Sequence, residues 1–135
     1  MTALAGVDRR ELGAIFAGGM AGALARVWIG QHFAAAAGSW PWATFAINVS
    51  GSFALAYFAT RLQERLPLSS YRRPLLATGF CGAYTTFSTM AVEILRISDR
   101  HGYALAAGYA AASIAAGLVA IWAATALARR TRVLW

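Results

Sequence analysis

Charged residues are scarce in this chain. They make up 13% of its 135 residues, lysine is absent, and Arg26 is the only formal charge between Leu12 and Thr60. Soluble domains carry about 25% charged residues. Because apolar residues also reach 59%, an ordinary soluble fold is excluded and a membrane protein is indicated.

Residues that build disulfides, metal sites and active sites are also few. Cys81 is the only cysteine, so one chain cannot form a disulfide framework, and His32 and His101 lie far apart in the sequence. No Ser-His-Asp, zinc-ligand or P-loop arrangement is present, and we therefore expect no enzyme. Seventeen Trp, Tyr and Phe residues in an aliphatic chain exclude intrinsic disorder.

Four segments are long enough and apolar enough to cross a membrane as helices. About 20 apolar residues span the hydrocarbon core. The segments are residues 12–36, 41–60, 74–95 and 102–128. We expect an all-α membrane protein in which residues 1–135 form a single four-helix transmembrane domain. A signal peptide is the weaker interpretation of the first segment, because apolar residues resume after Arg26.

The basic residues, which give a net charge of +7, follow the predicted topology. With four spans both termini share one side, and that side carries nine arginines against two, Arg96 and Arg100, on the other. The nine are Arg9, Arg10, Arg61, Arg65, Arg72, Arg73, Arg129, Arg130 and Arg132. The positive-inside rule therefore predicts cytoplasmic termini. Flanking arginines that face lipid headgroups explain the charge, so we expect no nucleic-acid partner.

Polar residues form a stripe along the second predicted span. Thr44, Asn48 and Ser52 recur every four residues and therefore share one face of a helix. Thr and Ser can bond back to their own helix, and interhelical hydrogen bonding would also satisfy them. The amide of Asn48 is less easily satisfied, so Asn48 is a candidate for binding a passing ion. Tyr109 and Ser113 repeat the pattern in the fourth span.

Arg26 is the only charge inside the first span. A buried arginine costs about 2.5–3.5 kcal/mol on insertion scales unless it finds water or an anion. It either extends to the membrane surface or lines an aqueous vestibule. Small residues share its helix face at Gly18, Gly22 and Gly30, and close helix packing is their simplest explanation.

The centre of the third span is poor helix material. Residues 78–89 contain two glycines, paired threonines and aromatic residues between good apolar helix formers. We expect a broken membrane helix near Gly82, although a kinked helix packed through its glycines is the alternative. A break would expose carbonyls that suit a cation and N–H groups that suit an anion. Such backbone survives in a membrane only where protein or water satisfies it.

Several motifs together resemble the Fluc family of fluoride channels. They are Gly-Gly-x-x-Gly-Ala-x-x-Arg at Gly18 to Arg26, Asn48-x-x-Gly51, Gly79-Phe80-x-Gly82, Thr85-Thr86-Phe87-Ser88-Thr89 with Glu93, and Tyr109 with Ser113. They cover nearly the whole chain. The resemblance implies a four-helix subunit, an antiparallel dual-topology dimer with two fluoride pores, and passive fluoride export across the bacterial inner membrane.

The resemblance also implies individual roles. Asn48 matches the pore asparagine and Phe87 the first of two pore phenylalanines. The second falls on Met90, whose thioether has no ring edge for an anion. The positions whose backbone carbonyls hold a structural sodium ion match Gly82 and Thr85. The remaining matches lie near the polar track of the ion, and they are Thr44, Tyr109, Ser113 and Glu93.

Two alternatives remain open. The arginine bias opposes insertion in both orientations, so a heterodimer with an oppositely oriented paralogue competes with the preferred homodimer. A proton-coupled exporter of the small multidrug resistance type would also be a short four-span dimer. That mechanism needs a carboxylate in the middle of the first span, and residues 12–36 contain none. Fluoride conduction is therefore the favoured function.

Overall fold

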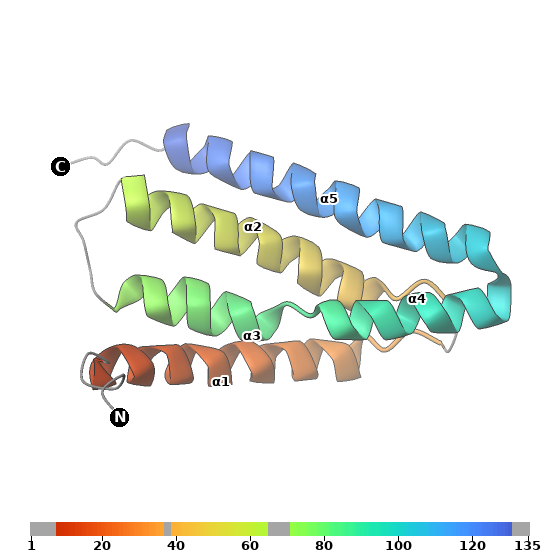
Figure 1. Ribbon diagram of the computed structural model, residues 1–135, viewed down its shortest axis with the longest axis horizontal. Coiled ribbons are helices and arrows are strands. Elements are labelled where there is room, and N and C mark those ends of the chain that lie inside the picture. Colours follow the sequence, from red (N-terminus) through yellow and green to blue (C-terminus); the bar gives the residue numbers. More distant parts are fainter. Residues whose placement is uncertain (1–7, 37–38, 65–70, 131–135) are drawn as a thin grey trace, which may run out of the picture.

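The computed structural model describes residues 8–36, 39–64 and 71–130, and these residues contain helices without strands (Figure 1). The elements in chain order are α1 (Arg9–His32), α2 (Trp42–Glu64), η1 (Pro74–Cys81), α3 (Gly82–Tyr84), α4 (Phe87–His101) and α5 (Tyr103–Arg130). The short η1 is a π-helix and the others are α-helices. The protein is all-helical, as the sequence predicts.

Three of these helices are long and apolar enough to cross a membrane. They are α1, the Trp42–Gln63 part of α2, and α5, with 24, 22 and 28 residues. A helix of 20 residues is about 30 Å long, so each reaches across a hydrocarbon core. The third predicted span, residues 74–95, is instead divided among η1, α3 and α4.

Local signals fix the helix ends. The Asp8 side chain caps α1 by accepting a hydrogen bond from the backbone N–H of Arg10 at 2.9 Å, which satisfies a donor that the first turn leaves unpaired. The Tyr71 hydroxyl also donates to Asp8 at 3.4 Å, so α1 and the segment leading into η1 begin side by side. Gly102 separates α4 from α5 at φ +83°, a conformation that suits glycine.

The helices pack in two groups (Figure 1). α1 lies along η1 and α3, while α5 packs against both α2 and α4. Glycines allow the first contact, since a Cβ added at Gly18 would meet the Leu75 carbonyl oxygen and one at Gly22 the Phe80 carbonyl oxygen. Close approach through small residues is typical of membrane helices. By contrast, Gly30 has nothing within 4 Å of such a Cβ.

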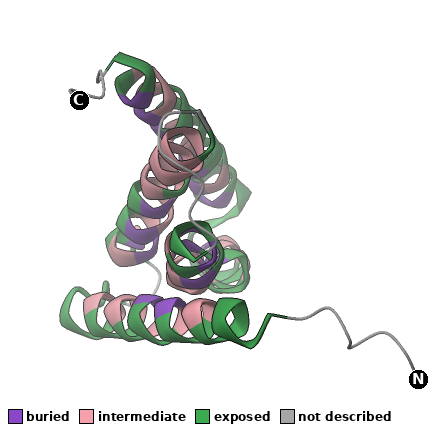
Figure 2. Cartoon of the chain, turned by 90° about the vertical axis from the view of Figure 1, so that its left-hand side faces the viewer, coloured by how far each residue is buried: buried purple, intermediate pink, exposed green. Residues whose placement is uncertain are grey.

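The buried core is small and lies between α4 and α5. It contains Met90, Ile97, Ala106 and Tyr109, with Trp40 and other partly buried residues packed against it. Tyr109 and Ile97 have no exposed surface. Buried positions face the interior between helices, whereas the outward faces are exposed (Figure 2).

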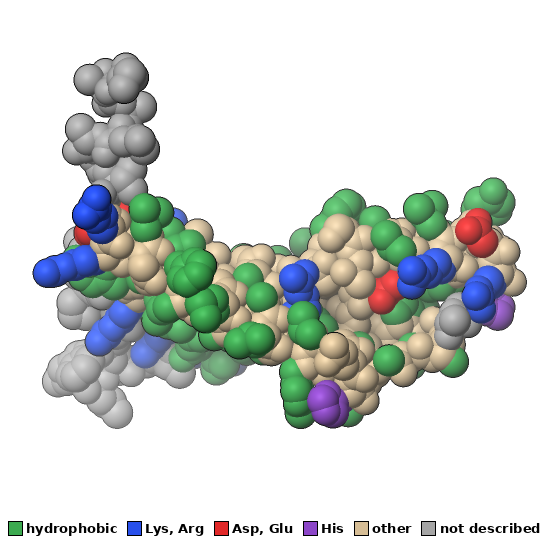
Figure 3. Space-filling view, turned by 90° about the horizontal axis from the view of Figure 1, so that it is seen from below, with side chains coloured by type: hydrophobic (Ala, Val, Ile, Leu, Met, Phe, Trp, Pro, Cys, Tyr) green, Lys and Arg blue, Asp and Glu red, His purple; other side chains and the backbone are tan. Residues whose placement is uncertain are grey.

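The outward faces are apolar. Large exposed side chains include Phe16, Leu24, Trp28, Leu118 and Trp122. Basic side chains gather at the end of the molecule where α1 begins (Figure 3). Wide apolar faces of this kind match a lipid environment rather than water. The chain is therefore a multi-pass membrane protein.

Candidate functional site

The helical backbone is interrupted at two threonines. α3 ends at Tyr84, Thr85 and Thr86 are extended, and α4 begins at Phe87. The Thr86 side chain caps α4, because its hydroxyl accepts a hydrogen bond from the backbone N–H of Thr89 at 3.2 Å. The interruption lies three residues after Gly82, which has ordinary helical angles.

The side chain of Asn48 on α2 forms hydrogen bonds with the backbone at this interruption. Its Nδ2 donates to the Thr86 carbonyl oxygen at 2.9 Å, and its Oδ1 accepts from the Thr86 N–H at 2.9 Å. A side-chain amide thus pairs with both backbone polar groups of one extended residue. Nδ2 carries two hydrogens, so one remains for another acceptor.

The hydrogen bonds at the interruption leave two backbone carbonyls without their usual helical donors. In a continuous α-helix each N–H donates to the carbonyl four residues earlier, so Thr86 would bond to Gly82 and Thr89 to Thr85. The Thr86 N–H donates to Asn48 instead, and the Thr89 N–H donates to the Thr86 hydroxyl. The carbonyls of Gly82 and Thr85 therefore lose their usual donors.

A cavity of about 260 Å³ lies beside the interruption. It brings together four residues that the sequence predicts for a pore, namely Asn48, Phe87, Met90 and Ser113. Its other lining residues are Ser52, Leu55, Thr85, Thr86 and Ile114. Residues from α2, α4 and α5 therefore meet at one point.

The pore candidates differ in exposure. Phe87 is 77% exposed and stands at the first position of α4, whereas Met90 is 9% exposed and packs into the core. The hydroxyl of Ser113 is buried without a hydrogen-bond partner in the described part of the chain. A buried hydroxyl without a partner is costly, so the Ser113 hydroxyl has an unused hydrogen-bonding capacity beside the cavity.

Glu93 organises a second polar group one turn away. The Thr44 hydroxyl donates to Glu93 Oε1 at 2.6 Å, and the Tyr109 hydroxyl donates to Oε2 at 2.9 Å. Thr44 and Tyr109 are buried, and Glu93 is half-buried. An ionised carboxylate only accepts hydrogen bonds, so each of its oxygens has a matching donor.

The two polar groups lie one helical turn apart on α2 and on α5, and we call this row of polar side chains the lane. Thr44 lies one turn before Asn48 on α2, and Tyr109 lies one turn before Ser113 on α5. Residues four apart share a helix face. Hydroxyl and amide groups therefore follow each other through a bundle that is otherwise apolar.

Arg26 stands apart from this lane. It is half-buried on α1, and it lines neither the cavity beside Asn48 nor the group around Glu93. Sequence reasoning identified neither Thr86 as the N-cap of α4 nor its pairing with Asn48. Thr before an apolar helical run is a preferred N-cap, so the sequence carried a signal for the first, whereas the second depends on the fold.

In the described part of the chain, the donors of the lane without a partner lie beside the interruption: they are the second Nδ2 hydrogen of Asn48 and the Ser113 hydroxyl, because the Thr44 and Tyr109 hydroxyls are bonded to Glu93. No group of three or more His, Cys, Asp and Glu residues that could hold a metal ion occurs within residues 8–36, 39–64 and 71–130. The fold and the lane together define a multi-pass helical membrane protein with a polar path between its helices.

Comparison with known proteins identifies the group to which the chain belongs. The family model described as "CrcB-like protein, Camphor Resistance (CrcB)" matches residues 13–125. The chain therefore belongs to the CrcB family. The resemblance found in its motifs is confirmed by curated relatives.

These relatives are all named fluoride-specific ion channels. The chain is 59% identical over 126 residues to "Fluoride-specific ion channel FluC 1" of Mycolicibacterium paratuberculosis, covering 93% of this chain and 96% of the relative. Identity is 54% over 126 residues, with the same coverage, for the protein of that name from Mycobacterium bovis. It is 41% over 115 residues for "Fluoride-specific ion channel FluC 2" of Geobacillus kaustophilus, covering 84% and 89%.

Proposed function

We propose that the protein is a fluoride-selective channel that lets fluoride leave the cytoplasm passively. The polar lane from Glu93 to Asn48 is the structural observation that carries this proposal. The names of relatives that match almost the whole chain support it. The chain is a transport protein and not an enzyme.

The lane accounts for how fluoride would cross the membrane. Transfer of a small ion from water to a low-dielectric interior costs tens of kcal/mol by Born reasoning, so donors must replace its water molecules. The free Nδ2 hydrogen of Asn48 and the unpaired Ser113 hydroxyl are such donors. The edge of the Phe87 ring carries positive partial charge and adds a further favourable contact.

The same donors on Asn48, Ser113 and Phe87 would favour fluoride over larger halides. A larger halide holds its water less tightly and gains less from closely spaced donors. Met90 provides no ring edge, so Phe87 is the aromatic contact of the cavity. The amide, the hydroxyl and the ring lie together at the cavity of about 260 Å³.

The functional unit is an antiparallel homodimer with four spans in each subunit, in which η1, α3 and α4 act together as the third span. The 77% exposure of Phe87 supports this proposal, because a ring beside the cavity would be covered by a second subunit. The alternative is a heterodimer with an oppositely oriented paralogue. The grouping of basic side chains at one end favours a single orientation (Figure 3).

Labelling of introduced cysteines separates these two assemblies. Ser39→Cys lies just before the start of α2 and Gln63→Cys near its end, so they report opposite ends of one helix. In intact cells, an impermeant thiol reagent would label both variants if the chain inserts in both orientations. Labelling of one variant only would exclude the homodimer.

The residues at the interruption fit a structural sodium ion. Sodium prefers oxygen ligands, and the carbonyls of Gly82 and Thr85 lack their usual helical donors because Asn48 and the Thr86 hydroxyl take those N–H groups. When bound, the ion would supply positive charge that fixes the ends of the interrupted helix. Gly82 is an exposed residue, which leaves room for a second subunit beside it.

Cellular fluoride measurements test the function. Bacteria that lack their own fluoride exporter should retain less fluoride, and grow at higher fluoride concentrations, when they express this chain in the inner membrane. In liposomes without a proton gradient, fluoride loss should still occur when a potassium ionophore balances the charge, because the proposed transport is passive. Loss that requires an imposed proton gradient would favour a proton-coupled exporter instead.

A further inference from the structure

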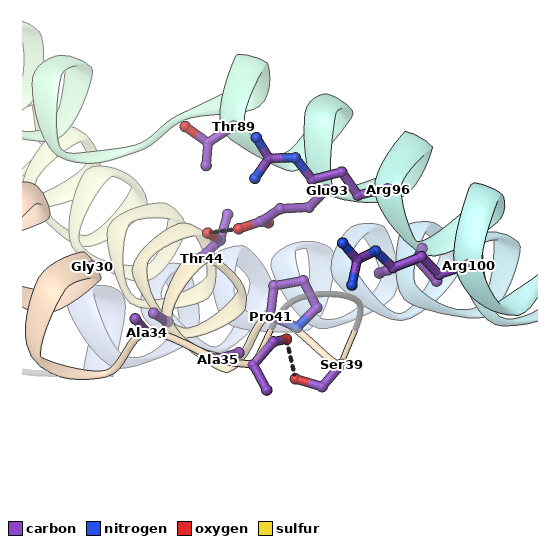
Figure 4. A pocket seen from close by; sticks show the side chains of 13 residues that line it. Gly30, Ala34, Ala35, Ser39, Pro41, Thr44, Thr89, Glu93, Arg96 and Arg100 are labelled. Atoms are coloured by element: carbon purple, nitrogen blue, oxygen red, sulfur yellow. Dashed lines mark hydrogen bonds between the residues drawn. The ribbon is translucent and has the colours of Figure 1, made fainter.

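A larger cavity opens near the end of the molecule opposite the start of α1 and the end of α5 (Figures 1 and 4). Its volume is about 510 Å³, far more than a single small ion fills. It lies between the end of α1, the start of α2, and α4. Its polar and charged lining residues are Ser39, Thr44, Thr89, Glu93, Arg96 and Arg100.

Two arginines give this cavity its charge. Arg96 and Arg100 lie four residues apart on α4 and therefore share a face of the helix. Figure 4 shows both side chains extending toward the hydrogen bond between Thr44 and Glu93. Both arginines are exposed, so the cavity is open to water.

Glu93 does not neutralise the cavity. Its two oxygens accept hydrogen bonds from Thr44 and Tyr109, and it is the single acidic residue among the lining residues, against two arginines. The formal charge of the lining residues is therefore +1. Charge of one sign on the wall of a cavity concentrates ions of the opposite sign and raises their rate of arrival by about 10- to 1,000-fold.

The cavity also joins the polar lane directly. Thr44 and Glu93 line it, and they are the first members of the lane that continues one turn further to Asn48. An anion held near the arginines is therefore adjacent to the hydroxyl groups of the lane. The arginines are too far along α4 to contact the cavity beside Asn48, which they do not line.

We propose that Arg96 and Arg100 form an anion-collecting mouth that concentrates small dissolved anions at the entrance of the lane. The proposal deepens the proposed function and rests on it for the identity of the transported ion. The guanidinium groups act through charge rather than by a fixed bidentate bond. Lysine at both positions should therefore preserve the effect, and glutamine should remove it.

The charge of the cavity can be measured without any transport. Ala34→Cys places a thiol on its wall, while the natural Cys81 has no exposed surface, and the chain without the substitution serves as the background. On purified protein, a negatively charged methanethiosulfonate reagent should react with Cys at position 34 faster than a positively charged one. Adding Arg96→Gln and Arg100→Gln should lower that rate ratio by about three- to tenfold.

Two matched variants control this measurement. Arg72→Gln with Arg73→Gln removes two exposed arginines at the other end of the molecule and should leave the ratio unchanged. Arg96→Lys with Arg100→Lys should also leave it unchanged. An unchanged ratio in the Arg96 and Arg100 glutamine variant, with its helicity retained, would overturn the proposal.

Fluoride efflux from liposomes supplies the second readout. The Arg96 and Arg100 glutamine variant should release fluoride about fivefold more slowly than the unaltered chain at low ionic strength, and the difference should shrink at high salt because salt screens the charge. An equal deficit at all salt concentrations would overturn the proposal. If the unaltered chain conducts no fluoride, the proposed function fails, whereas the thiol-reaction ratio still decides whether the mouth collects anions.

Discussion

Asn48 and Thr86 are joined by two hydrogen bonds of 2.9 Å each, between the side-chain amide of one residue and the backbone N–H and carbonyl of the other. This pair holds the extended segment against α2. It also diverts the Thr86 N–H from Gly82. One side chain thereby stabilises the interruption, releases a carbonyl, and keeps a donor hydrogen for the cavity.

Replacing Asn48 with Asp should affect both stability and transport. The carboxylate has no N–H to donate to the Thr86 carbonyl, and the unpaired carbonyl should cost about 1–3 kcal/mol of unfolding free energy. The substituted carboxylate would also put a negative charge and no donor beside the cavity, whereas both oxygens of Glu93 accept hydrogen bonds from hydroxyl groups, so efflux from liposomes should fall strongly. Gln63→Glu, the same chemical change at an exposed site, is the control. Undiminished fluoride efflux in Asn48→Asp would reject the role of Asn48.

Replacing Phe87 with Ala should reduce transport while the helices remain intact. The ring is 77% exposed, so its loss should leave the helical circular dichroism signal unchanged. A ring-edge contact is worth about 0.5–1.5 kcal/mol, and its loss should slow fluoride efflux by up to about tenfold. Trp122→Ala on α5, at 73% exposure, should conduct normally. Equal losses in both variants would point to a general packing effect.

Replacing Gly22 with Ala should destabilise the packing of α1 on η1. The added Cβ would meet the Phe80 carbonyl oxygen, and backbone cannot yield as a flexible side chain can. Overpacking of this kind costs about 1–3 kcal/mol or more, measurable by thermal unfolding in detergent. Gly13→Ala on the same helix has nothing within 4 Å and should be neutral or slightly stabilising. Equal melting temperatures for the two variants would contradict the close contact.

Glu93 and Tyr109 should be energetically coupled. A double-mutant cycle with Glu93→Gln and Tyr109→Phe isolates their 2.9 Å hydrogen bond, and we expect a coupling energy of about 1 kcal/mol from unfolding in mixed micelles. Tyr103→Phe, at 86% exposure on the same helix, should show no coupling with Glu93→Gln. Strictly additive effects at Glu93 and Tyr109 would mean that the bond contributes nothing to stability.

Much of the helical layout could be predicted from hydropathy alone, because spanning length is a property of composition. The predicted ends of the helices were less accurate. The first span was predicted at 12–36, yet α1 begins at Arg9 and ends at His32. Asp8 followed by Glu11 is a helix-start signal that would have placed this end correctly.

The interruption shows what a single sequence cannot supply. The break was expected near Gly82 because glycines, paired threonines and aromatic residues weaken helices there; Gly82 itself has helical angles, and the extended residues are Thr85 and Thr86. Their conformation depends on Asn48, which lies 38 residues away. The pairing of α1 with η1 and of α2 with α5 depends in the same way on contacts between distant segments. From the sequence, Arg96 and Arg100 could only be assigned to one side of the membrane. Their shared cavity could not be predicted, because it exists only after α1, α2 and α4 come together.

The most direct test uses an electrode selective for fluoride. Liposomes that contain the purified chain are loaded with fluoride and chloride at equal concentrations, and an added potassium ionophore balances the charge. We predict rapid release of fluoride while chloride stays inside. Release of both anions at the same rate, or no fluoride release from correctly folded protein, would contradict a fluoride-selective path through Asn48 and Phe87.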